Sequence, residues 1–453
     1  MVTDLNIVNG KIVLENRIFD GGISIENGRI RAIAKSMKLP KAESTVDVSG
    51  NLVLPGLIDA NVHLRDMNLS HKEDFYTGTC AAANGGFTTV LDMPSPVPTT
   101  NNPANLKEKM ERARGRIIAN VGFHASLPVC EEHFKELSEM GATSFHINFN
   151  NPMTEANVDN DERLLTSFIY AREARRPVSV AAFDRALIEG RRRMLGRDTS
   201  LRGFLDVYSP PVEISAVKRV LRLANRAKAR MHLNYVSQFD SLELINRAKR
   251  DGLKVTCEVT PHHLLLSRED TLRLGGICLM LPVLTSQFNA RKLWSGVSGR
   301  LVDVIASDHA PHTVEEKRAS NVWDVSKGIP GLETTLPLLL KAVRNGRLSL
   351  FQLVRLLAKK PALIFNLGNR GTITPGFDAD LTIVDLKREY KIDSSKFKSK
   401  ARYSPFDGWA VKGKVVKTFI RGRLVVDDGE IVAKPGTGYI LRSTFKVRKN
   451  RPD

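Results

Sequence analysis

Eight short apolar runs, rich in β-branched residues, recur along the middle of the chain, and each is followed by a polar stretch with helical spacing. They occupy residues 52–58, 87–93, 117–123, 143–149, 177–182, 231–236, 254–259 and 302–306. Continuous apolar strands that alternate with amphipathic helices are typical of a parallel sheet covered by helices. Eight such units are enough to close a barrel. We therefore predict an α/β fold built on a (β/α)8 TIM barrel.

The two ends of the chain have a different texture. Residues 1–54 hold short β-type runs separated by turn pairs such as Asn9-Gly10 and Asn27-Gly28, and similar runs return at 371–435. Asn-Gly pairs favour tight hairpins. We predict a small composite β-sandwich domain from both termini (1–54 plus 370–445), a barrel over 55–369 and a basic tail at 446–453.

The composition is that of an ordinary soluble protein, with 42% hydrophobic and 26% charged residues. No apolar run is long enough to predict a membrane-spanning helix, and the start of the chain lacks a signal-peptide pattern. We therefore expect a cytoplasmic protein with no membrane partner. The four cysteines, at positions 80, 130, 257 and 278, form no C-x-x-C pair and are expected to be small buried residues.

The net charge of +19 leaves three kinds of partner open: nucleic acid, an acidic protein or an anionic ligand. Basic residues cluster at 191–193 and 446–451, but no aromatic residues are interleaved with them. A nucleic-acid partner is the least favoured of the three. Strongly salt-dependent binding would identify it.

Polar residues at the ends of the predicted strands are the candidates for chemistry, because barrel enzymes carry their sites there. The first run leads into Asn61, His63 and Arg65. The last leads into Asp308-His309-Ala-Pro-His312, which brings a carboxylate and two imidazoles together. An Asp in that position can serve as a metal ligand, a general base or both.

Several segments together resemble the dihydroorotases of the cyclic amidohydrolase family over nearly the whole chain. The segments that carry the resemblance are 55–59, 63–65, 73–74, 77–78, 81–89, 92–94, 258–266, 307–312, 328–333 and 376–380. The resemblance implies a hydrolase of cyclic amides in pyrimidine biosynthesis. It also implies one or two zinc ions, with a metal-bound hydroxide as nucleophile and an Asp that shuttles the proton.

Most of the zinc ligands that the resemblance implies are replaced. Carried over residue by residue, the family's ligand positions fall on Asn61, His63, His146, Ala181, Tyr235 and Asp308, and only His63 and Asp308 match. His146 stands where the family has a carboxylated lysine, and Ala181 has no donor atom. Tyr235 could bind only as a phenolate, against a reference pKa of about 10.

A two-zinc centre is therefore not expected. The resemblance leaves zero or one zinc ion, with His63, His146 and Asp308 as its ligands and Asp308 also as the catalytic residue. Three protein ligands and a water are enough for a catalytic zinc site.

The implied contacts to substrate are partly kept. Arg65 and His312 stand where the family binds the substrate carboxylate, and Ser95 stands where the family has an Asn. Leu281 and Thr285 replace an Asn and an Arg, so the pocket loses groups that would discriminate a polar ring. A small anionic cyclic amide is the expected ligand.

Three functions stay open. The first is a weakly active or inactive dihydroorotase-like protein, homo-oligomeric, that serves as a scaffold for aspartate transcarbamoylase, as some relatives do. The second is an active hydrolase with one metal, acting on a cyclic amide or ureide. The third is a basic binding module. Metal content and dihydroorotate turnover would separate the first two.

Overall fold

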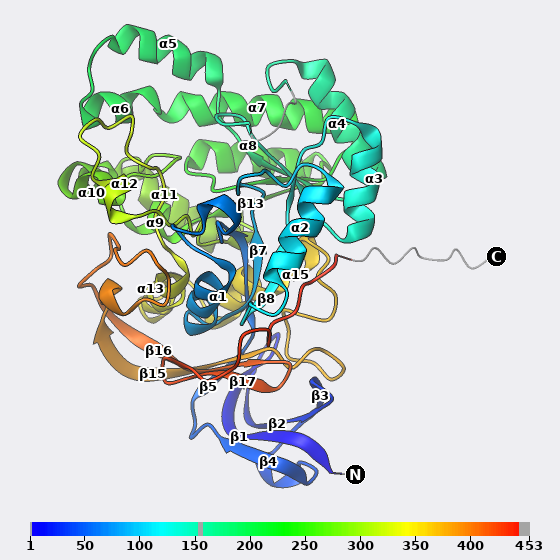
Figure 1. The fold of residues 1–453 in the computed structure, drawn as a ribbon. Helices are drawn as coiled ribbons and strands as arrows, with labels where there is room; N and C mark the ends of the chain where they lie inside the picture. The colour runs from blue at the N-terminus through cyan, green and yellow to red at the C-terminus, as the bar shows by residue number, and fades with distance from the viewer. Residues whose placement is uncertain (1, 153–156, 444–453) are drawn as a thin grey trace.

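The computed structural model describes residues 2–152 and 157–443, so the predicted tail at 446–453 lies outside the described residues. Figure 1 shows two parts, a helix-covered barrel and a β-sheet packed against one end of it. The amino-terminal strands lie in this sheet, whereas the last described residues run along the barrel, where the Leu441 N–H donates to the carbonyl of Val121 at 2.7 Å. The predicted fold class, a (β/α)8 barrel with a β-structure from both termini, is confirmed.

The barrel consists of eight parallel strands. They are β6 (Leu57–Val62), β7 (Phe87–Asp92), β8 (Asn120–Phe123), β10 (Phe145–Asn148), β11 (Val178–Ala181), β12 (Met231–Leu233), β13 (Val255–Val259) and β14 (Val304–Ile305). A two-residue strand, β9 (Ala125–Ser126), pairs with β10. The ring closes where the His63 N–H donates to the carbonyl of His309 at 2.8 Å. The strand ends after β6 and β14 are therefore neighbours.

The second sheet joins the two termini. Its strands are β1 (Thr3–Val13), β2 (Ile18–Glu26), β3 (Arg29–Ala34), β4 (Ala42–Asp47), β5 (Leu52–Pro55), β15 (Leu381–Lys391), β16 (Ala410–Ile420), β17 (Arg423–Asp427) and β18 (Glu430–Ile431). Strand β5 pairs with β1 on one side and with β15 on the other. It therefore links the amino-terminal strands to the carboxy-terminal ones.

The run at 52–58, predicted as a single barrel strand, is two strands in two different sheets. Strand β5 lies in the terminal sheet, β6 lies in the barrel, and Gly56 separates them. A Cβ on Gly56 would lie 2.2 Å from the Thr88 hydroxyl, while its N–H donates to the carbonyl of Asp380 at 2.7 Å. Only glycine allows the chain to pass so closely between the two sheets.

Helices cover the outside of the barrel. They are α1 (Phe75–Asn84), α2 (Pro103–Ala113), α3 (Glu131–Met140), α4 (Asp161–Glu173), α5 (Arg185–Leu195), α6 (Leu201–Val207), α7 (Pro210–Ala227), α8 (Phe239–Arg250), α9 (Pro261–Leu265), α10 (Arg268–Leu274), α11 (Gln287–Ser298), α12 (Val314–Lys317), α13 (Leu332–Arg344), α14 (Leu350–Val354) and α15 (Lys360–Ile364), with a π-helix at Arg355–Lys359. Among the described residues, no helix is both long and apolar enough to cross a bilayer.

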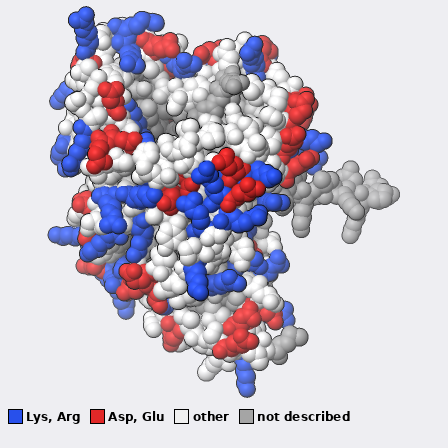
Figure 2. All heavy atoms as spheres, viewed as in Figure 1, with Lys and Arg blue, Asp and Glu red and all other residues white. Residues whose placement is uncertain are grey.

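Two expectations about the surface can be compared with the structure. Cys80, Cys257 and Cys278 are buried as predicted, but Cys130, at the start of α3, is only partly covered, so that prediction is wrong for one residue. On the face in Figure 2, Lys and Arg are interspersed with Asp and Glu. That face shows no continuous basic stripe of the kind that binds nucleic acid.

Candidate functional site

The predicted site residues converge on one cavity at the carboxyl ends of the barrel strands. The cavity has a volume of about 470 Å³. Among the residues that line it are His63, Arg65, Ser95, His146, Tyr235, Asp308 and His312. Asn61 and Ala181 are fully buried below it. Seven of the predicted side chains therefore lie around one opening, and their roles in binding or catalysis stay predictions.

Three of these residues have left-handed backbone conformations. The φ angle is 59° at Arg65, 36° at Tyr235 and 48° at Asp308. Side chains other than glycine rarely adopt these values, and such strained positions gather at functional sites. The backbone geometry therefore marks this strand-end region independently of the side chains.

A buried carboxylate, Glu258 on β13, organises the floor of the site. Its Oε1 accepts hydrogen bonds from the side-chain amides of Asn61 at 2.7 Å and Asn234 at 3.0 Å, and its Oε2 pairs with His232 Nε2 at 3.0 Å. We call these four residues the Glu258 cluster. Burial opposes ionisation of Glu258, but the hydrogen bonds and the charge of His232 lower its pKa below the usual value.

The Glu258 cluster explains the residue at position 61. Asn61 has replaced a histidine of the implied ligand set, and its amide is now committed to Glu258. Sequence reasoning assigned no role to Glu258 or His232. The available signal was an acid within the otherwise apolar run 254–259, because an unpaired buried charge is costly and predicts a partner.

His63 connects two other residues of the cavity. Its Nδ1 lies 2.5 Å from the Ser95 hydroxyl, and its Nε2 lies 3.6 Å from Asp308 Oδ1. Burial, with repulsion from Arg65, lowers the pKa of His63 well below its usual value. Burial, with repulsion from Glu258, raises the pKa of Asp308 well above its usual value. The order Ser–His–Asp is that of a nucleophile and its base, but the lowered pKa makes His63 a weaker base.

Of the other replaced positions, His146 offers one neutral imidazole and Tyr235 offers only a protonated phenol. His146 Nδ1 is 3.1 Å from the Ser179 hydroxyl, and burial lowers the pKa of His146 to about 3. Burial, together with the carboxylates of Asp308 and Glu258, raises the pKa of Tyr235 well above 10. Its phenol therefore stays protonated and is a poor ligand.

The donor set does not fit the metal centre that the resemblance implies. His63, His146 and Asp308 share the cavity, but no three His, Cys, Asp or Glu residues are grouped to hold a metal in residues 2–152 and 157–443. The amide nitrogen of Asn61 is engaged by Glu258, its Oδ1 has no hydrogen-bond partner among the described residues, and Ala181 offers no donor atom. A single zinc ion on His63, His146 and Asp308 stays a prediction, and we assign no step of chemistry to it.

The rim of the cavity keeps its basic groups. Arg65 donates from Nε to the carbonyl of Pro311 at 3.3 Å and contacts His312 Nε2 through Nη2 at 3.2 Å. Lys72 pairs with Glu316 at 2.8 Å and lies 3.3 Å from His312 Nδ1. Burial and the neighbouring cations, Arg65 first, lower the pKa of His312 to about 2, so its ring is neutral. Arg65 is the cation that could meet a ligand carboxylate.

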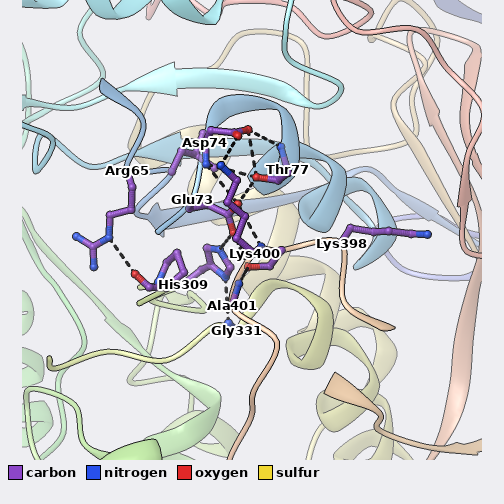
Figure 3. A network of polar contacts seen from close by, with 12 residues as sticks. Arg65, Glu73, Asp74, Thr77, His309, Gly331, Lys398, Lys400 and Ala401 are labelled. Carbon is purple, nitrogen blue, oxygen red and sulfur yellow. Dashed lines mark hydrogen bonds and ion pairs between the residues drawn. The ribbon is translucent and has the colours of Figure 1, made fainter. Parts of the chain in front are cut away.

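A second polar network surrounds the residues that follow β14, the eighth barrel strand. Figure 3 shows Glu73 close to Thr77, Lys400 and His309. Glu73 accepts from the hydroxyls of Thr77 and Ser399, and its Oε2 lies 3.5 Å from His309 Nε2. The loop between β15 and β16 is thereby tied to the residue that follows Asp308.

Known proteins match the chain over nearly its full length. The amidohydrolase family model matches residues 52–425. The chain is 36% identical over 433 residues to a dihydroorotase from Methanothermobacter thermautotrophicus, covering 96% of each chain. It is 31% identical over 465 residues to an L-hydantoinase from Paenarthrobacter aurescens, covering 98% of this chain and 100% of that one.

Solved structures agree with these matches. An L-hydantoinase (dihydropyrimidinase) from Arthrobacter aurescens superposes with a TM-score of 0.94 at 30% identity, covering 97% of this chain and 100% of that one. A dihydropyrimidinase from Brevibacillus agri gives a TM-score of 0.89 at 27% identity, with 97% and 99% covered. The chain belongs to the amidohydrolase family, as a homologue of its dihydroorotases and hydantoinases.

Proposed function

We propose that this protein binds a small carboxylate-bearing cyclic amide, or its ring-opened form, and does not hydrolyse it by the metal-dependent route of its family. The observation that carries the proposal is the Glu258 cluster. It engages the side chain at the first ligand position, Asn61, in a buried hydrogen bond of 2.7 Å. The amide nitrogen that donates this bond has no lone pair for a metal.

Recognition of the ligand rests on Arg65. Its guanidinium lines the cavity, is held in place by the carbonyl of Pro311, and stays charged at neutral pH. Dihydroorotate carries one carboxylate and N-carbamoyl-aspartate two, and a carboxylate matches the planar fork of the guanidinium. The names of the similar dihydroorotases support this choice of ligand.

The weakness of the chemistry rests on the protonation states. Burial shifts the pKa of His63 downward and the pKa values of Asp308 and the Tyr235 phenol upward, in each case toward the uncharged form. These directions oppose the charged carboxylate or phenolate that would activate water. Hydrolysis of an unactivated amide needs a strong nucleophile or a stabilised oxyanion.

The test is calorimetric titration of dihydroorotate and of N-carbamoyl-aspartate, with and without a chelator. We expect binding that the chelator leaves unchanged and that Arg65→Met weakens about tenfold or more, since a hydrogen bond to a charged group contributes about 1.5–3 kcal/mol. Arg114→Met is the matched control, because Arg114, at the carboxyl end of α2, is exposed and does not line the cavity. A parallel turnover assay should give no metal-dependent rate.

Two results would contradict the proposal. Turnover that the chelator abolishes and zinc restores would favour the active one-metal hydrolase instead. Equal affinity in Arg65→Met and the parent protein would show that Arg65 does not hold the ligand.

The remaining sequence predictions belong to the proposal as well. A partnership with aspartate transcarbamoylase, a homo-oligomeric state and a cytoplasmic location rest on the resemblance and the composition. Co-sedimentation of the purified protein with aspartate transcarbamoylase is the direct measurement for the first two.

A further inference from the structure

A second cavity of about 470 Å³ lies at the opposite end of the barrel from the candidate site. Its wall includes Pro55, which precedes β6, and Arg300, which precedes β14. It is therefore at the amino-terminal ends of the strands, where the barrel meets the terminal sheet. Ligand pockets are frequently found at such junctions between structural units.

The charges around this cavity are unbalanced. Arg300, Arg355 and Lys359 line it, against a single carboxylate, Glu15, which is already ion-paired with Lys359. Asp303 attracts Arg355, but its own carboxylate pairs with Lys249 and, at 3.7 Å, with Lys360. Two guanidinium groups are left without a carboxylate partner of their own.

The two arginines are presented differently. Arg355 Nη2 donates to the carbonyl of Val302 at 3.0 Å, which fixes the guanidinium, while its buried Nε has no hydrogen-bond partner in the described part of the chain. The exposed Arg300 side chain makes no hydrogen bond or ion pair with the described residues, and its φ of 62° places it on a tight turn after α11. A guanidinium group held in place, beside one that is available for a ligand, is a suitable arrangement for an anion with several oxygens.

The backbone that carries Arg355 is unusual. Arg355 and Lys359 are the first and last residues of a five-residue π-helix between α14 and α15. π-Helical turns are rare and frequently occur at functional sites. Here the π-helix directs both of its basic ends to the same cavity.

Part of the cavity lining is apolar. Leu14, Ile373 and Phe351 line it, and Phe351 keeps 37% of its surface exposed. A ligand with an apolar or planar part could cover this surface while its anionic part meets the arginines.

We propose that this cavity binds a small phosphorylated compound, with the phosphate or pyrophosphate group at Arg300 and Arg355 and an apolar or planar group against Phe351. The site is separate from the carboxylate site at Arg65 and does not depend on the function proposed for it. Its volume is in the range of small-ligand pockets, about 300–1,000 Å³.

Pyrophosphate, ATP and adenosine, titrated calorimetrically in the presence of a chelator and at physiological salt, test the proposal. We expect pyrophosphate and ATP to bind, ATP more tightly, and adenosine not to bind measurably. Arg300→Gln should weaken both about tenfold or more, because it removes a charged hydrogen-bond donor. Arg355→Gln should do the same. Arg300 is exposed, so its variant should still fold if the Arg355 variant does not.

Two control variants separate specific binding from general attraction to a basic protein. Arg197→Gln changes an exposed arginine between α5 and α6 and should leave both affinities unchanged. Arg65→Met should also leave them unchanged. Equal weakening by Arg197→Gln, loss of binding in Arg65→Met, or no heat from either phosphate compound would overturn the proposal.

Discussion

A buried ion pair below the candidate site allows a quantitative test of how the structure is held together. Lys109 on α2 lies 2.7 Å from Asp92 Oδ2, at the end of β7, and also donates to the carbonyl of Met93 at 2.8 Å. The two side chains are 1% and 2% exposed. Burial is the largest influence on both, raising the pKa of Asp92 and lowering that of Lys109. The pair fixes the strand end that leads to Ser95.

Replacement of Lys109 by Met keeps the volume of the side chain but removes the charge. Asp92 then keeps a hydrogen bond from the Leu64 N–H, at 2.8 Å, while its Oδ2 is left buried and unpaired. Breaking a buried pair in this way costs about 3–5 kcal/mol. Lys107→Met, on the exposed side of the same helix, should change stability by less than about 0.5 kcal/mol.

The pH dependence adds a second readout. In Lys109→Met the folded-state pKa of Asp92 should rise further above its unfolded value of 3.8. Folding then binds a proton, so the loss of stability should be larger at pH 8 than at pH 5. Urea unfolding followed by fluorescence at both pH values measures this. The double variant with Asp92→Asn should lose less than the sum of the two single changes.

Two results would refute this reasoning. A cost below about 1 kcal/mol at pH 8 would show that the pair is not desolvated as the structure indicates. A cost of the same size at both pH values would show that Asp92 is not the group left unpaired.

Three further predictions concern metal, acid and backbone. After zinc loading, elemental analysis should find at most about one equivalent per chain, and Asp308→Ala should remove it; two tight equivalents would contradict the assignment of the lost ligands. The pKa of buried His263 is lowered from 6.5 to about 4, so its contribution to stability is complete above pH 6.5 and is lost as the pH falls toward 4. That loss is about 3 kcal/mol. In His263→Gln the free energy of unfolding should therefore fall less steeply between pH 6.5 and pH 4 than in the parent protein. The same slope in both proteins would show that His263 is not the titrating group. Gly56→Ala should destabilise the protein by more than about 1 kcal/mol, because the added Cβ would meet Thr88. Gly190→Ala, within α5, should stabilise it by up to about 1 kcal/mol, because nothing lies within 4 Å of the added Cβ. Equal Tm values for the two variants would contradict the packing argument.

The barrel could be predicted from the sequence because its signal is local. Each of the eight apolar runs carries its own evidence, and seven of the eight predicted ranges each contain one barrel strand. The run at 52–58 was predicted incorrectly because its break depends on a tertiary contact. Nothing in the neighbouring residues of Gly56 shows that Thr88 and Asp380 approach it.

The site could be predicted only in part, for a related reason. The resemblance predicted that Arg65 and His312 lie together at the substrate carboxylate, and they are 3.2 Å apart although 247 residues separate them in the chain. It could not predict that Asn61 would bind Glu258, 197 residues away, because side-chain pairing inside a barrel depends on strand tilt and on rotamers. Resemblance identified Asn61 as a lost ligand, and only the structure assigns it a new partner.

The distribution of kept and replaced residues over the barrel bears on the proposal that the site binds a ligand without hydrolysing it. The replaced donors His146, Ala181 and Tyr235 lie on or just after the consecutive strands β10, β11 and β12. The kept groups Arg65 and His312 follow β6 and β14, which adjoin each other where the ring closes. Two contacts hold the segments that follow β6 and β14: the ion pair of Lys72 with Glu316 and the contact of Glu73 with His309. Neither contact involves a residue of β10, β11 or β12. Asn61, the fourth replaced position, lies on β6 itself, and its side chain donates to Glu258. This arrangement supports the proposal that a carboxylate ligand binds at a site where four of the family's donor positions are replaced.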